Sequence, residues 1–357
     1  MSGALAHPYR PDHAIAPGET LRRQLDAIDL SQADLAARTG LSTKHVNQIV
    51  QGIAPITLET ALALERVTGL PATVWNRLEA DYREALLRDD QRDLSKQDIK
   101  WIEMFPIKEL QRSGHLPRKG DPPSIYEALL AFFGVADRSA WERIWLSPVA
   151  SFKRTKAFRS EPGAVAAWLR LGQIKARDIE TAPYSATEFK RALAKARLLT
   201  RADDFDTQLV QLAAEAGVAV VFAAEIGECR LSGAAWWGSP RRAVIGLSDR
   251  YKREDNFWFS FFHEAAHILL HSKKETFVDD GSADDQLEDE ANRFAANILI
   301  PPAAARELPL LHNDADVLRF AKDLGISPGI VVGRLHNDKH WSWGRGNHLR
   351  RSLRIED

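Results

Sequence analysis

Cysteine is nearly absent from this sequence, since Cys229 is the only one among 357 residues. One thiol cannot form an intramolecular disulfide or a cysteine-rich zinc module. The sequence is therefore typical of a protein of the reducing cytoplasm, and we expect Cys229 to be a buried or half-buried free thiol.

Long apolar runs and an excess of one charge are missing too. No stretch reaches the roughly 18 uninterrupted apolar residues of a membrane span, so we expect no membrane segment. Lys and Arg number 48 against 49 Asp and Glu, a formal net charge of -1, which excludes a chain that is polybasic as a whole. Any binding to nucleic acid must be local. With 45% hydrophobic and 27% charged residues, the chain has the composition of a globular protein.

The pattern of apolar residues predicts an α+β fold that is mainly α, in three domains. Residues 1–88 read as an all-α bundle of short helices, and residues 89–184 as a helical connector domain with its own fold. In residues 185–357, a β-branched run at 218–222 and a strand-turn-strand pattern at 231–248 predict a small sheet. Two helices, near 256–271 and 287–300, are expected to follow it.

The first functional pattern is a helix-turn-helix. Ser31 is placed to cap one helix, Gly40 lies at the turn, and Ser42 caps a second helix that directs Val46 and Ile49 inward. The outward face is polar and able to bond base edges, while Gln32 is placed to meet a phosphate. We predict the DNA-binding residues to be Gln32, Ser42, Thr43, Lys44, Asn47, Gln48 and Gln51.

The charge of this module leaves an alternative open. Between Gly18 and Leu70 it carries five basic and six acidic side chains, so the same bundle is compatible with protein docking. If it binds double-stranded operator DNA, we expect a homodimer on a palindrome, where two weak half-sites add their contacts. The basic end of the chain, which includes Arg350 and Arg351, reads as a solvated terminus.

The second pattern is an HExxH, formed by residues 263–267. Residues four apart lie one turn above another, so the imidazoles of His263 and His267 can face one metal ion. Glu264, about 100° round the helix, is then placed to act on water. Imidazole and carboxylate ligands suit zinc, and three protein ligands leave a position open. The alternative is a purely structural role for His263 and His267 as a pair of buried, hydrogen-bonded histidines.

A third ligand is expected from the helix near 287–300. On a helical wheel Glu288 borders the apolar arc, whereas Glu290 lies about 160° away. We therefore rank Glu288 first, with Glu290 and His271 as rivals. Asn292, one turn after Glu288, is placed to orient a ligating histidine through a hydrogen bond.

Two resemblances now stand out. Residues 17–82 resemble XRE-type DNA-binding domains of the HigA antitoxin kind. The ordered segments KRALAKARLLT, AGVAVVF, LSGAAWW, NFWFSFFHEAAHILLH, EDEANRFAANILIP and SPGIVVGRL resemble the ImmA/IrrE metallopeptidases, a zincin-like (gluzincin) fold. The second resemblance implies Zn²⁺ held by His263, His267 and Glu288, with Glu264 as general base. It also implies cleavage of a regulatory protein.

Two interpretations of function follow. In one, a cytoplasmic DNA-binding transcription regulator carries an active zinc endopeptidase with a protein substrate. In the other, a HigA-like antitoxin and repressor uses its zincin-like domain to bind a toxin partner or a signal without proteolysis.

Other residues carry weaker patterns. Ala234, Ala235 and Trp236 are candidates for an edge strand that receives substrate backbone, with packing of the aromatic side chain as the alternative. His336, His340 and His348 have irregular spacing, so we expect surface histidines and no second metal site.

Overall fold

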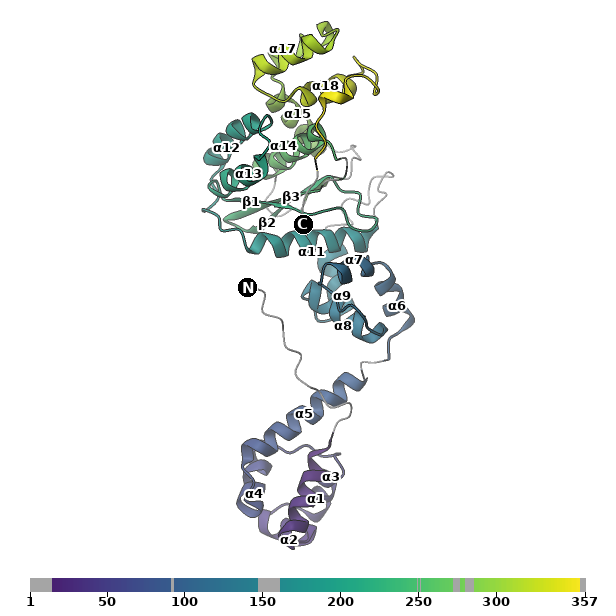
Figure 1. The fold of residues 1–357 in the computed structure, drawn as a ribbon. Coiled ribbons are helices and arrows are strands. Elements are labelled where there is room, and N and C mark those ends of the chain that lie inside the picture. The colour runs from purple at the N-terminus through teal and green to yellow at the C-terminus, as the bar shows by residue number, and fades with distance from the viewer. Residues whose placement is uncertain are drawn as a thin grey trace. The chain divides into compact units, whose positions relative to one another are not determined.

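The computed structural model describes residues 15–90, 93–146, 161–248, 250, 252–271, 277–279 and 286–353. The chain divides into two compact units, residues 1–95 and 96–357, which are described separately. Helices dominate both units, and one small sheet lies in the second (Figure 1). The expected mainly α, α+β fold is confirmed.

The first unit is a bundle of five helices around one apolar core. They are α1 (Pro17–Ala27), α2 (Gln32–Thr39), α3 (Thr43–Val50), α4 (Leu58–Thr68) and α5 (Ala72–Asp90). Leu21, Leu35, Val46 and Trp75 are fully buried, so each helix turns its apolar stripe inward. Gly18 lets α1 pack closely on α3, because a Cβ there would collide with the carbonyl oxygens of Ile49 and Val50.

The second unit begins with helices around an aromatic core. They are α6 (Lys96–Glu103), α7 (Ile107–Arg112), α8 (Pro122–Phe133), α9 (Arg138–Trp141), the π-helical turn Glu142–Leu146 and α11 (Pro162–Arg177). Trp101, Phe105 and Trp141 pack edge to face, with ring centroids 4.9 to 5.6 Å apart. The same core continues through α11 to one face of the sheet.

The sheet has the strand order β1-β3-β2-β4. Its strands are β1 (Val218–Phe222), β2 (Gly233–Ser239), β3 (Arg242–Leu247) and β4 (Phe277–Asp279), and only the β1–β3 pair is parallel. Alternate residues serve two cores: Val218 and Val220 pack against α12 to α14, while Ala219 and Val221 pack against α11. Helices on both faces explain why these strands read as continuous apolar runs.

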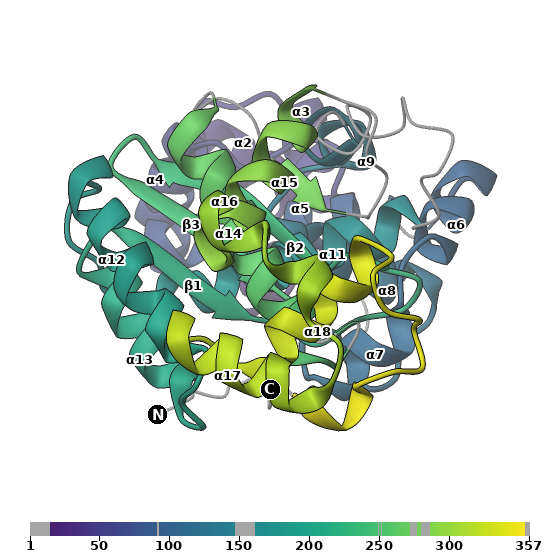
Figure 2. The same ribbon diagram turned by 90° about the horizontal axis from the view of Figure 1, so that it is seen from above.

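The remaining helices cover the other face of the sheet and extend from it. They are α12 (Ala186–Leu199), α13 (Phe205–Ala214), α14 (Glu254–Leu270), α15 (Gln286–Leu299), α16 (Pro302–Ala305), α17 (Asp314–Leu324) and α18 (Pro328–Asn337), with 3-10 turns at Leu308–Leu310 and Asn347–Leu349. Figure 2 shows α14 lying across β2 and β3, with α15 beside it.

Two expectations change in this fold. Residues 96–184 belong to the same compact unit as the sheet, because α11 buries its apolar face on strands β1, β2 and β3. The proposed edge strand at Ala234, Ala235 and Trp236 is wrong. Strand β4 pairs with Gly233, Ala234 and Ala235, and Trp236 is 6% exposed and packs against Gly172 of α11.

No helix in the described ranges is long and apolar enough to cross a membrane. Cys229 is free and buried, as expected, and its burial raises the pKa of the thiol to about 12.

Candidate metal centre and helix-turn-helix surface

The helix that carries the HExxH is buried along most of its length. Trp258, Phe261, Phe262 and Ala265 of α14 are at most 1% exposed and form part of the core that meets the sheet. This packing fixes the rotation of α14, so the remaining face directs its polar side chains toward α15.

The N-terminus of α14 is held by the end of the chain. Glu254, which is fully buried, accepts from Arg351 Nε at 2.6 Å and from Ser327 Oγ at 2.8 Å. Asp255 pairs with Arg350 at 2.7 Å. Two acidic residues in the first turn also suit the helix dipole. The expected solvated basic terminus is thus wrong for Arg350 and Arg351, which anchor the N-terminus of α14.

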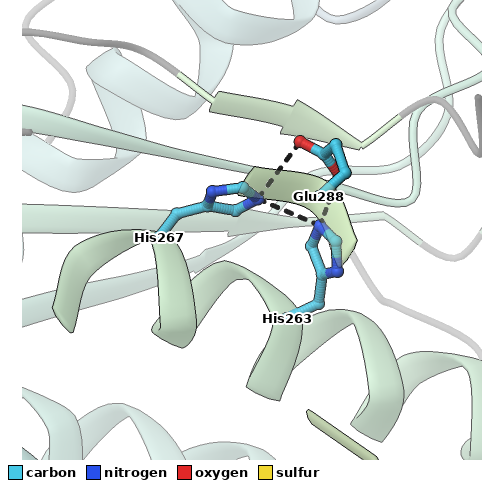
Figure 3. Close-up of side chains that lie close together, drawn as sticks. All are labelled: His263, His267 and Glu288. Atoms are coloured by element: carbon cyan, nitrogen blue, oxygen red, sulfur yellow. Dashed lines mark hydrogen bonds and ion pairs between the residues drawn. The ribbon is translucent and has the colours of Figure 1, made fainter. Parts of the chain in front are cut away.

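Three side chains bring potential ligand atoms together. His263 and His267 point from adjacent turns of α14 toward Glu288 on α15 (Figure 3). Their Nε2 atoms lie 3.0 Å apart, and the Glu288 carboxylate oxygens lie 3.1 Å from His263 Nε2 and 3.4 Å from His267 Nε2. Two ligands of a tetrahedral zinc ion lie about 3.3 Å apart when each is about 2.0–2.1 Å from the metal. The donor set therefore fits zinc in type, number and spacing.

The electrostatics of the cluster suit a cation. His263 and His267 are 2% and 1% exposed. Burial, followed by the neighbouring His263 and His271, lowers the pKa of His267 to about 2. His267 is consequently neutral near pH 7, the form in which an imidazole offers a lone pair to a metal.

The structure places the three candidates for the third ligand in two different positions. Glu288 joins the cluster, which is the one such group of His, Cys, Asp and Glu side chains found in the described part of the chain. Asn292 Oδ1 lies 3.1 Å from His263 Nδ1, as expected of an orienting residue. His271 and Glu290 lie behind His267 and face each other at 3.4 Å.

Glu264 is fully buried beside the cluster and against strand β2. A Cβ added to Gly233 would come within 2.8 Å of Glu264 Cγ and 2.9 Å of its Oε1. Gly233 therefore leaves the room in which this carboxylate lies. The sequence does not predict this contact between Gly233 and Glu264, because a single glycine gives no local indication of which distant residue packs against it.

Histidines elsewhere form no second cluster of this kind among the described residues. His340 and His348 are exposed, as expected. The expectation of a surface side chain is wrong for His336, which is 1% exposed and hydrogen-bonds through Nε2 to the carbonyl oxygen of Arg345 at 2.7 Å.

The helix-turn-helix is formed by α2, a turn and α3. Ser31 and Asp34 make a reciprocal capping box, Gly40 ends α2 in the left-handed conformation with φ of 75°, and Ser42 caps α3. These local signals place α3 as the sequence predicts.

The predicted DNA-binding side chains lie along α3 and its two ends, except for Gln32, which begins α2. Ser42, Thr43, Lys44, Asn47 and Gln51 are exposed, and Gln32 and Gln48 are half-buried. Asn47 Nδ2 donates to Gln32 Oε1 at 3.5 Å, which brings the start of α2 to the same surface.

Two different protein families match the two units of this chain. Residues 21–75 match the helix-turn-helix family, and residues 202–336 match the IrrE N-terminal-like domain. "Virulence-associated protein I" of Dichelobacter nodosus is 34% identical over 83 residues, which cover 23% of this chain and 77% of that protein.

Two solved structures are each similar to about a fifth of this chain. An addiction module antidote protein of the HigA family from Coxiella burnetii is 30% identical, covers 22% of this chain and 87% of its own, and has a TM-score of 0.22. The antitoxin HigA of Pseudomonas aeruginosa, solved with the higBA promoter, is 32% identical with the same coverage and TM-score.

The family matches extend over the capped helices α2 and α3 and over the helices that carry His263, His267 and Glu288. The chain thus belongs to the XRE-type helix-turn-helix family through its N-terminal unit and carries an IrrE N-terminal-like, metallopeptidase-like domain in its C-terminal unit.

Proposed function

We propose that this protein is a DNA-binding transcription regulator whose C-terminal domain is a zinc-dependent endopeptidase acting on a regulatory protein. The observation that carries the proposal is the cluster of the buried His263 and His267 with the half-buried Glu288, whose ligand atoms all lie within 4.8 Å of one another. Glu264, the candidate base, stands next to His263 on the same helix.

Within this site each residue has a distinct task. His263, His267 and Glu288 would hold the zinc ion, which supplies Lewis acidity toward a peptide carbonyl and toward water when bound. Glu264 would accept a proton from the attacking water at a carboxylate oxygen and deliver it to the leaving amide nitrogen. Glu264 is fully buried, and strand β2 lies against its carboxylate at Gly233, which limits the positions that the carboxylate can take during both transfers.

The N-terminal unit would direct this domain to DNA. The face of α3 offers amide and hydroxyl groups that suit base edges, and the N-termini of α2 and α3 suit phosphates. With five basic and six acidic side chains in residues 18–70, one copy supplies little phosphate neutralisation. We therefore expect two copies on a palindromic operator.

The peptidase half is tested by comparing the full-length wild type with Glu264→Gln after zinc loading. Both proteins should contain about one zinc per chain, because Glu264 is not a ligand. Each is incubated with a soluble extract of the source cells, and new protein N-termini are identified by mass spectrometry. The proposal expects N-termini that appear only with the wild type. Zinc binding with no such termini would leave the interpretation in which the domain binds a partner without proteolysis.

A further inference from the structure

His271 and Glu290, the two other candidates for the third ligand, form a series of contacts on the side of His267 that faces away from the donor cluster. His267 Nδ1 and His271 Nδ1 are 2.8 Å apart, and His271 Nε2 lies 3.4 Å from Glu290 Oε2. On its other side, His267 directs Nε2 at the donor cluster. Glu290, His271 and His267 thus form a line that ends at the proposed metal position.

When His267 serves as a ligand with both imidazoles neutral, one arrangement of protons allows hydrogen bonds from His267 to His271 and from His271 to Glu290. His267 Nε2 then offers a lone pair, so the proton of the neutral ring is on Nδ1. Two facing Nδ1 atoms at 2.8 Å need one N–H and one lone pair, which makes His271 Nδ1 the acceptor. The remaining proton of His271 is on Nε2, where it points at the Glu290 carboxylate.

The backbone holds His271 in the position that this arrangement needs. Helix α14 ends at Leu270, and His271 takes an extended conformation with φ of -109° and ψ of 175°. Its N–H still donates to the carbonyl oxygen of His267 at 3.2 Å. The backbone N–H and the ring of His271 thus both contact His267, and the His271 side chain is only 2% exposed.

His263 provides an internal comparison. Its Nδ1 is paired with Asn292 Oδ1 at 3.1 Å, so each imidazole of the cluster has a partner behind it. For His263 that partner is an amide on α15, and for His267 it is a second imidazole at the end of α14.

We propose that His271, supported by Glu290, is a positioning residue that fixes the tautomer and ring orientation of His267 for metal binding. This inference rests on the proposed metal centre. Groups that hydrogen-bond a ligating histidine from behind commonly contribute about 10–100-fold to metal affinity. Glu290 is 48% exposed in its side chain and 3.4 Å from His271, so its share should be the smaller one.

The test compares two substitutions in the full chain. His271→Phe keeps a planar ring and removes the acceptor, whereas His271→Asn places an amide oxygen where Nδ1 lies, the group that serves His263. Zinc affinity is measured by competition with a chromophoric chelator, and Co²⁺ absorption spectra report ligand geometry. Thermal melting of the zinc-free proteins checks that each variant folds.

We expect His271→Phe to lower zinc affinity about 10–100-fold and to shift the Co²⁺ bands, and His271→Asn to restore most of both. Glu290→Gln should have a smaller effect than His271→Phe. Equal affinities for wild type, Phe and Asn variants would overturn the positioning role, as would equal losses in the Phe and Asn variants. A wild-type chain that binds no zinc would overturn both this inference and the proposed metal centre.

Discussion

Helices α3 and α14 each carry a set of candidate functional residues, and the two sets are built in opposite ways. The α3 set is largely exposed and lies between Ser42 and Gln51, with Gln32 at the start of the preceding helix. Caps at Ser31 and Ser42 position it. The α14 set is buried and needs partners from α15 that are as far as 29 positions away in sequence. The exposed side chains of α3 can therefore be changed with little effect on stability. The side chains of α14 lie in packing that also stabilises the fold.

The sharpest test of this comparison is the removal of a ligand from the buried set. His263→Ala should lower zinc affinity by roughly 3 kcal/mol or more, over about 100-fold, because a three-residue donor set loses one member. Metal analysis and chelator competition measure the change. Operator binding in a gel shift should remain. An unchanged zinc affinity would show that His263 is only packed and hydrogen-bonded.

A smaller disturbance of the same region is Gly233→Ala. The new Cβ would be about as close to Glu264 Cγ and Oε1 as the 2.8 and 2.9 Å found for an ideal Cβ, so the carboxylate must move. Since general bases contribute about 10²–10⁴-fold, we expect at least a tenfold loss of peptidase rate with zinc retained. Gly238→Ala is the matched control, because its Cβ meets only ordinary contacts, the nearest at 3.7 Å. Equal rates for the two variants would mean that Gly233 has no such role.

The exposed region should respond in DNA affinity alone. Asn47→Ala and Gln48→Ala are each expected to weaken specific operator binding by roughly 1–3 kcal/mol, since each removes a side chain suited to a base edge. Gel shifts of the full chain on its own promoter measure this, with zinc content as a second readout. Gln211→Ala, an exposed glutamine of α13, is the control. Full-strength binding by both variants would show that Asn47 and Gln48 do not contribute to operator recognition. A full chain that fails to bind in low salt would favour the protein-docking interpretation of the bundle.

The smallest expected effect concerns the capping box. Ser31→Ala should lower the free energy of unfolding of the N-terminal unit by about 1 kcal/mol, because the cap of α2 is lost. Lys44→Ala leaves both caps in place and should melt like the wild type. Denaturant unfolding followed by circular dichroism gives the comparison.

The loss of stability in Ser31→Ala should also depend on pH. Hydrogen bonds from the side chain and then the backbone of Ser31 lower the pKa of Asp34 from its usual 3.8. A carboxyl whose pKa is lower in the folded state stabilises the fold above its unfolded pKa, and this contribution is lost as the pH falls through the folded pKa. The difference between wild type and Ser31→Ala should therefore shrink in strong acid. A constant difference down to pH about 2 would exclude a contribution from Asp34.

The sequence by itself determined the features that depend on local spacing. Helix α3 and its capped start follow from Ser42 and the apolar period, and the shared face of His263 and His267 follows from 3.6 residues per turn. The preference for Glu288 over Glu290 also came from a helical wheel, since an amphipathic helix has one inward side.

Tertiary structure alone decided what depends on neighbours remote in the chain. Strand β4 removed the expected free edge at Ala234, α11 joined residues 96–184 to the sheet, and Arg350 and Arg351 became anchors for α14. Gly233 beside Glu264 and His271 behind His267 acquired their candidate roles in the same way. Local spacing fixes which side of a helix a residue occupies, but only the burial of apolar faces against each other selects which distant backbone or side chain it meets there.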